Sequence, residues 1–132
     1  MLRITAFYAA LLAVLFIYLS VRVIGWRREH RVEFGHGENS ELLRRMRVHA
    51  NFAEYVPFAL LLMALAESMV PPDLVVHLAG LLLSAGRLLH AYGTGQSPPI
   101  MRYRVYGTVL TFAAIGIAAI ACLALSTFFL VV

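Results

Sequence analysis

A polar stripe precedes a strongly apolar segment in the middle of this sequence. In RMRVHANFAEYVP, residues 45–57, a cation, an amide and a carboxylate follow one another as Arg47, Asn51 and Glu54. At about 100° per residue, these side chains fall within about 60° of one another on a helix, and Arg44 lies at the edge of the same stripe. Such a surface can hold a ligand that carries carboxylate, amide and ammonium groups. An internal ion pair explains it equally, with Arg47 or Arg44 neutralising Glu54 so that the helix can enter a membrane.

Other polar residues with possible chemistry lie near the ends of the apolar segments. His49 points away from the stripe, so a site that uses it needs a second helix or a neighbouring subunit. His90 lies three residues after Arg87 and can share a helical face with it. It either contacts a ligand or is satisfied by a neighbouring helix. His30 and His36 come without cysteine or a His-x-x-x-His pair, so no metal site is predicted.

The elements that position these groups are predicted to be membrane helices. Of the 132 residues, 61% are hydrophobic and 14% are charged, whereas soluble domains carry about 25% charged residues. The apolar residues fall in long blocks, and residues 105–132 carry no charge. We therefore expect an all-α integral membrane protein with one domain, residues 1–132, folded as a four-transmembrane-helix bundle. Ser40 and Asp73 are expected to cap the second and third helices. The predicted helices span residues 3–27, 42–69, 73–94 and 101–130.

The distribution of basic residues predicts the orientation in the membrane. All 11 basic residues are arginines. By the positive-inside rule, the connections after the first and third helices are cytoplasmic, and both termini lie outside the cytoplasm. The net charge of +4 thus reflects topology, and no soluble basic domain exists that would bind nucleic acid. Seven of the arginines surround the first connection: Arg22, Arg27, Arg28, Arg31, Arg44, Arg45 and Arg47.

Three segments carry a resemblance to a known family. RVHANFAEYVP resembles the second-helix signature of the MAPEG family, the membrane-associated proteins of eicosanoid and glutathione metabolism. VIGWRREHRV is similar to the end of the first helix in the leukotriene-forming members. GRLLHAYG is similar to the third-helix segment of the prostaglandin E synthase members and their bacterial relatives. The likeness extends over essentially the whole chain and is strongest to the small bacterial inner-membrane members, which implies the same location for this protein.

The resemblance implies a homotrimer that binds glutathione between neighbouring subunits near the cytoplasmic face. It implies that Arg47 and Arg27 each hold a carboxylate of glutathione, that Glu54 holds the ammonium and that Asn51 meets the amides. Guanidinium groups suit this role because they pair with carboxylates bidentately. The positions that match the family's glutathione-binding residues are Arg27, Arg47, His49, Asn51, Glu54, Tyr55, His90 and Tyr106.

The resemblance also implies an arginine at the start of the fourth helix that stabilises the glutathione thiolate. A free thiol has a pKa of about 8.5, and a nearby guanidinium lowers that pKa. MRYRVYG offers two candidates for the catalytic residue. Arg104 matches the Arg-x-x-Gly start of the bacterial relatives, and Arg102 has Tyr106 one turn later. We favour Arg104 and keep Arg102 as the rival. Thr94 stands where some relatives carry a tyrosine, so the thiol has one potential hydrogen bond fewer.

The function expected from this resemblance is a glutathione-dependent transferase or peroxidase acting on a lipophilic electrophile that enters from the lipid bilayer. Glutathione would be a co-substrate, and no metal is expected. The alternative is a non-catalytic trimeric member of the family that holds a lipid or a partner protein. The threonine at position 94 slightly favours this alternative. Whether the protein is an enzyme stays open. A small transporter or channel is disfavoured because no helix looks broken or repeated.

Overall fold

Four long helices and three short connections make up the chain. The computed structural model describes residues 1–131, and all four helices in this range are long and apolar enough to cross a membrane. Each helix begins and ends within two residues of its predicted range, so the prediction of four long apolar helices is confirmed. The helices are α1 (Arg3–Glu29), α2 (Ser40–Ser68), α3 (Asp73–Gly95) and α4 (Met101–Val131).

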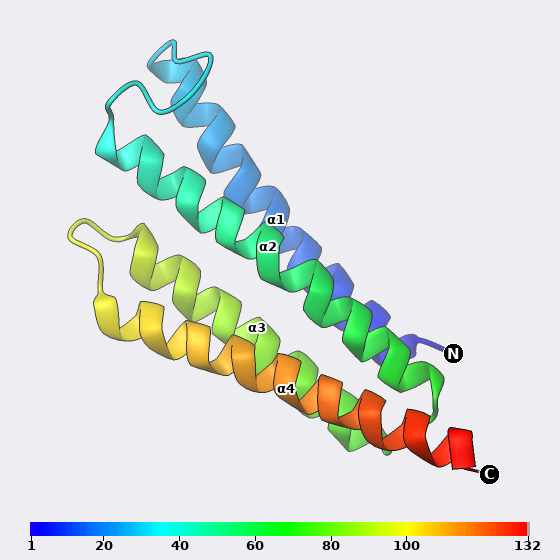
Figure 1. Cartoon of the computed structure of the whole chain (residues 1–132). Helices are drawn as coiled ribbons and strands as arrows, with labels where there is room; N and C mark the ends of the chain where they lie inside the picture. Colours follow the sequence, from blue (N-terminus) through cyan, green and yellow to red (C-terminus); the bar gives the residue numbers. More distant parts are fainter. Residues whose placement is uncertain (132) are drawn as a thin grey trace.

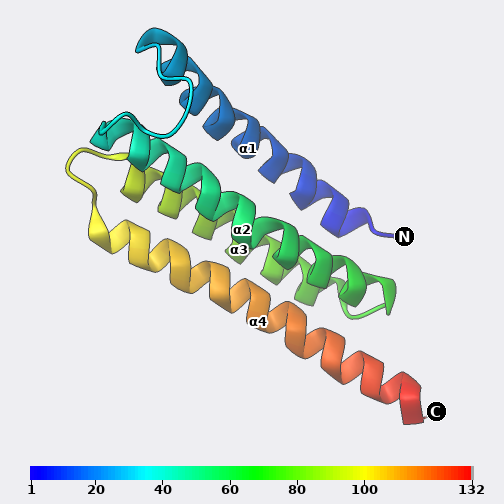
Figure 2. The ribbon, with the colours of Figure 1, turned by 45° about the horizontal axis from the view of Figure 1, so that its top comes forward.

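The helices alternate in direction along the chain. The α1–α2 and α3–α4 connections lie at one end of the bundle, which we call the connection end (Figure 1). Both termini and the α2–α3 turn lie at the other end. Helix α2 contacts the other three helices, whereas within the described residues α1 packs on α2 and α3 and does not contact α4. The arginine-rich segments therefore gather at one end (Figure 2).

Glycines let α3 and α4 approach closely at the connection end. A Cβ added at Gly107 of α4 would lie 2.5 Å from the backbone nitrogen of His90, and one at Gly93 of α3 would lie 2.7 Å from the backbone nitrogen of Arg104. Both distances are shorter than real side chains allow, so only glycine permits this spacing. The close approach brings His90 of α3 beside the first turns of α4.

The apolar side chains divide between a core and an outward surface. Leu12, Phe52, Met63 and Leu83 come from three different helices and are almost completely buried in one cluster. Many other large apolar side chains are exposed on the outside of the bundle, as expected where lipid is the solvent.

The ends of the helices differ from two of the predicted caps. Asn39, not Ser40, caps α2, because the Asn39 Oδ1 accepts hydrogen bonds from the amides of Glu41 and Leu42 at 2.9 and 3.0 Å. Asp73 is the first residue of α3 and makes no cap hydrogen bond. Both predictions were wrong by one position. At α2 the neighbouring polar residues Asn39 and Ser40 compete for the same cap, whereas the N-cap residue of α3 is Pro72, which makes no side-chain cap hydrogen bond.

A side chain of α2 caps the start of α1. The carboxylate of Glu67 accepts hydrogen bonds from the backbone amides of Ile4 at 2.9 Å and Thr5 at 2.7 Å. These amides have no partner within their own helix, and the positive end of the helix dipole favours a carboxylate there. Glu67 therefore fastens the start of α1 to the rest of the bundle at the end opposite the connection end.

Candidate functional site

A pocket of about 520 Å³ opens at the connection end, where α2, α3 and α4 meet. Helix α2 contributes the stripe noted in the sequence, α3 contributes its last turns, and α4 contributes its first turn. The connection between α3 and α4 forms one rim. The lining residues are Ser40, Leu43, Arg44, Arg47, Asn51, His90, Thr94, Ser97, Pro98, Pro99 and Arg104.

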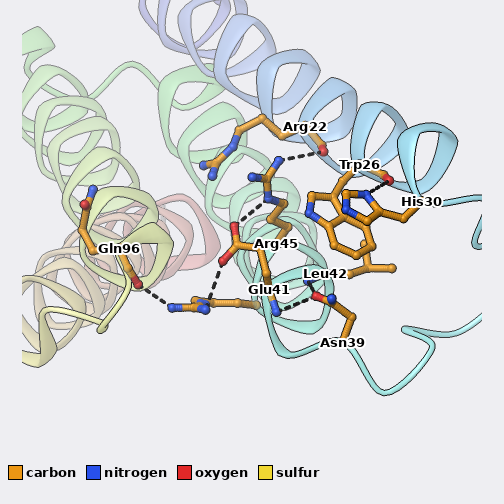
Figure 3. Close-up of polar contacts among 9 residues, drawn as sticks. Arg22, Trp26, His30, Asn39, Glu41, Leu42, Arg45 and Gln96 are labelled. Carbon is orange, nitrogen blue, oxygen red and sulfur yellow. Dashed lines mark hydrogen bonds and ion pairs between the residues drawn. The ribbon is translucent and has the colours of Figure 1, made fainter.

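Arg44 and Glu54 do not form the ion pair that the sequence left open. Arg44 pairs with Glu41 at 3.0 Å and donates to the backbone oxygen of Gln96 at 2.7 Å. Glu41 also pairs with Arg45 at 2.7 Å, so one carboxylate serves both arginines (Figure 3). Glu54 is exposed and, within the described residues, has no ion pair. The hypothesis that Arg47 or Arg44 neutralises Glu54 inside the subunit is therefore wrong.

Arg47 lines the pocket, and its guanidinium has no hydrogen-bond or ion-pair partner among the described residues. Its side chain is exposed. Arg104 lines the same pocket from α4 and is likewise exposed. Two cations without internal counter-ions thus face one cavity, and such a cavity attracts an anionic ligand.

Asn51 is held in a fixed orientation by a buried arginine. Arg87 is only 2% exposed, and its Nη2 donates to Asn51 Oδ1 at 2.7 Å. Its Nη1 approaches the hydroxyl of Thr111 at 3.4 Å, and its guanidinium lies 6.0 Å from the centre of the Tyr55 ring. The amide oxygen is therefore occupied, which leaves the Asn51 amide nitrogen to donate to a ligand in the pocket.

Arg87 was not among the predicted site residues, although a signal for it was present. Within the described residues it has no carboxylate partner, and an ionisable side chain deep in a membrane helix usually marks a functional site. Its spacing of three residues from His90 indicated a shared face. The partner, Asn51, lies 36 residues away in the sequence, so the contact itself was not visible.

His90 and Thr94 present unused polar atoms beside the pocket. They are 4% and 8% exposed, and neither His90 Nδ1 nor Thr94 Oγ1 has a hydrogen-bond partner within the described part of the chain. Buried polar atoms without partners are costly, so each one calls for an explanation. A ligand that enters the pocket can supply the missing partners.

The structure separates the two rival arginines of α4. Arg104 lines the pocket, whereas Arg102 and Tyr106 are exposed and lie outside its lining. Tyr55 also lies outside it, with its ring 5.6 Å from that of Phe112 on α4. Glu54 continues the α2 stripe one turn deeper than Asn51, beyond the pocket lining.

The remaining predicted residues, Arg27 of α1 and His49 of α2, make contacts between these two helices and lie outside the pocket lining. The side chain of Arg27 donates to the backbone oxygen of Val32 and to the sulfur of Met46, both at 3.4 Å or less. His49 shares a 3.0 Å hydrogen bond with Ser20 of α1. Six of the ten predicted residues thus form two groups: a pocket group, which is Arg47, Asn51, His90 and Arg104, and an α1-side group, which is Arg27 and His49. The other four, Glu54, Tyr55, Arg102 and Tyr106, belong to neither group. Within one subunit the two groups do not meet.

The described residues contain no cluster of three or more histidine, cysteine, aspartate or glutamate side chains that could hold a metal ion. The side chains that line the pocket offer guanidinium, amide, imidazole and hydroxyl groups. These groups bind and stabilise anions.

Comparison with known proteins agrees with the residues that carry the family resemblance. Residues 5–124 match the model of the MAPEG family. Inner membrane protein YecN of Escherichia coli strain K12 is 37% identical over 118 residues, which cover 89% of this chain and 88% of that protein. YecN of a second Escherichia coli strain matches with the same identity and coverage.

Proposed function

The chain belongs to the MAPEG family as a multi-pass bacterial inner-membrane protein, and from that premise we propose that it binds glutathione in the pocket at the connection end. The observation that carries the proposal is a pair of guanidinium groups without partners among the described residues, Arg47 and Arg104, which line the same pocket as the oriented amide of Asn51. Glutathione carries two carboxylates, an ammonium, two amides and a thiol. The pocket offers a complementary group for most of them.

Most polar groups of glutathione have a partner in this proposal. Arg47 binds a carboxylate, because guanidinium and carboxylate match bidentately. The Asn51 amide nitrogen donates to a peptide carbonyl of the ligand. Glu54, at the deep end of the stripe, receives the ammonium, and His90 supplies a further hydrogen bond.

The proposed chemistry is the attack of the glutathione thiolate on a lipophilic electrophile. Arg104 stabilises the thiolate from the start of α4, and we favour it over Arg102 because Arg104 lines the pocket. Each unit by which the thiol pKa falls requires about 1.4 kcal/mol of preferential stabilisation of the anion. The thiolate sulfur forms a bond to the electrophilic carbon, and the leaving group departs with the electron pair. The acceptor reaches the site from the bilayer.

A second copy of the chain would complete the site. Arg27 and His49 face away from the pocket group in one subunit, so a homotrimer with each site shared between two chains would reunite the predicted set. Native mass spectrometry in mild detergent tests the assembly. A monomer that still binds glutathione would contradict the shared site.

A non-catalytic binding protein is the second candidate, and Thr94 favours it. Where some relatives carry a tyrosine, Thr94 is buried and its hydroxyl is too short to replace a phenol. Chlorodinitrobenzene serves as a general electrophile to separate the candidates. Glutathione binding without conjugation of this probe supports the binding protein.

The variant Glu54→Gln tests glutathione binding directly. It keeps the shape of the side chain but removes the charge that would hold the ammonium, so glutathione affinity should fall by about 1.5–3 kcal/mol, the usual value of a charge-assisted hydrogen bond. The melting temperature without ligand should not change, because Glu54 is exposed and unpaired within the described residues. Isothermal titration calorimetry measures the affinity.

Glu29→Gln is the matched control, since Glu29 is exposed at the end of α1 and outside the pocket. Glu29→Gln should change neither the glutathione affinity nor the melting temperature without ligand. Equal glutathione affinity in wild type and Glu54→Gln would remove Glu54 from the site. No heat of binding and no thermal stabilisation of the wild type by glutathione would reject the proposed function.

A further inference from the structure

A second polar cavity lies between α1 and α3 at the connection end, on a different face of α3 from the glutathione pocket. Its volume is about 340 Å³, and it shares no lining residue with that pocket. Arg22 and Tyr18 line it from α1, and Tyr92 and Gln96 line it from the end of α3. Tyr18 and Tyr92 are 57% and 55% exposed, so the cavity opens to the outside of the bundle.

The charge of Arg22 is not matched inside the subunit. Its guanidinium lies 5.7 Å from the centre of the Tyr18 ring, and within the described residues it has no carboxylate partner. The nearby acid, Glu41, is already shared by Arg44 and Arg45. Figure 3 shows no interaction of the Arg22 guanidinium with the residues drawn. Three arginines against one acid leave a local excess of positive charge.

The Arg22 guanidinium lies beside Gly95 at the end of α3. A Cβ at Gly95 would lie 3.4 Å from Arg22 Nη1, at the short end of van der Waals contact, and Gly95 is itself part of the lining. The guanidinium therefore sits against the last turn of α3. This is the depth at which the helix leaves the apolar region and the chain turns back.

The two helices change from apolar to polar in the same order along this groove. Helices α1 and α3 run in the same direction, toward the connection end (Figure 1). On each helix, residues spaced three or four apart lie on one face, and on these faces leucines come first, a tyrosine follows, and polar groups come last. The residues concerned are Leu11, Leu15, Tyr18 and Arg22 on α1, and Leu88 and Tyr92 on α3.

We propose that this groove binds one anionic phospholipid of the leaflet at the connection end, with the lipid phosphate on Arg22. Guanidinium groups pair with phosphate oxygens, and basic pockets between membrane helices bind lipid headgroups. The tyrosines lie at the level of the interface, where their amphipathic rings are favoured, and the leucines cover an acyl chain. The excess of positive charge selects an anionic headgroup over a zwitterionic one.

Native mass spectrometry of the full chain with added lipid tests this proposal. The wild type should retain phosphatidylglycerol about ten times better or more than phosphatidylcholine with the same acyl chains, since the preference reflects at least one charge-assisted contact. Arg22→Gln should abolish this preference. Arg22→Lys, which restores a positive charge, should keep a preference for phosphatidylglycerol.

Arg28→Gln is the control, because Arg28 is exposed in the last turn of the same helix and lies outside the cavity. It should bind phosphatidylglycerol as the wild type does. An unchanged lipid preference in Arg22→Gln would overturn the proposal. So would thermal stabilisation by inorganic phosphate equal to that by phosphatidylglycerol, since the site would then hold a free anion. Arg22→Gln should keep its glutathione affinity, which separates this test from that of the glutathione pocket.

Discussion

The variant Asn51→Asp separates the two roles that the structure gives to this side chain. Asn51 accepts a hydrogen bond from the buried Arg87 at 2.7 Å and leaves its amide nitrogen for the pocket. Aspartate has the same shape, but it replaces that nitrogen by a second oxygen and adds a negative charge. The substitution should therefore improve the contact with Arg87 and harm the contact with glutathione.

The two effects have opposite signs. Arg87 now interacts with neutral groups only among the described residues, and an ion pair at the same distance is about twice as strong as a hydrogen bond between neutral groups. Because Asn51 is half-buried beside an open pocket, the new carboxylate stays partly hydrated, and we expect a gain in stability of about 1–2 kcal/mol. Glutathione loses the amide donor of Asn51, and its carboxylates meet the negative charge of the new aspartate. Its binding should therefore weaken by about 1.5–3 kcal/mol, or about ten- to 150-fold.

Thermal unfolding in detergent without ligand measures the first effect, and titration calorimetry with glutathione measures the second. Asn39→Asp is the matched control, because it makes the same chemical change at the N-cap of the same helix, where aspartate is as good a cap as asparagine. It should leave glutathione affinity unchanged. If Asn51→Asp binds glutathione as tightly as the wild type, Asn51 does not donate to the ligand. A loss of stability would show that Arg87 gains nothing from a counter-ion.

Two further predictions concern the fastening of α1 and the orientation of the chain. Glu67→Gln should destabilise the protein by about 1–3 kcal/mol, because one of the two capping oxygens becomes a donor that faces a backbone amide. Hydrogen exchange at the start of α1 should speed up, and unchanged exchange there would contradict the cap. For orientation, a cysteine at Gly37 in a Cys122→Ala background should react with a membrane-impermeant thiol reagent only after the cells are opened. Labelling of intact cells would reverse the proposed cytoplasmic location of the α1–α2 connection.

The comparison of sequence and structure is clearest for α4. Arg102 and Arg104 are two residues apart, about 200° around a helix, so only one of them can face a given neighbour. Nothing in the local sequence chooses between them. The choice depends on how α4 is rotated about its axis, and the close contact of Gly93 and Gly107 with the facing backbones determines that rotation.

The sequence alone determined the number of membrane helices, their limits and the common face of Arg47 and Asn51. These properties depend on the length of apolar runs and on the periodicity of a single helix, which are local. The partners of the charged residues were decided only by the tertiary structure. Glu41 rather than Glu54 neutralises Arg44, and Arg87 reaches Asn51 from another helix. Helical periodicity orients a side chain relative to its own axis, whereas the packing of one helix on another decides which side chains meet.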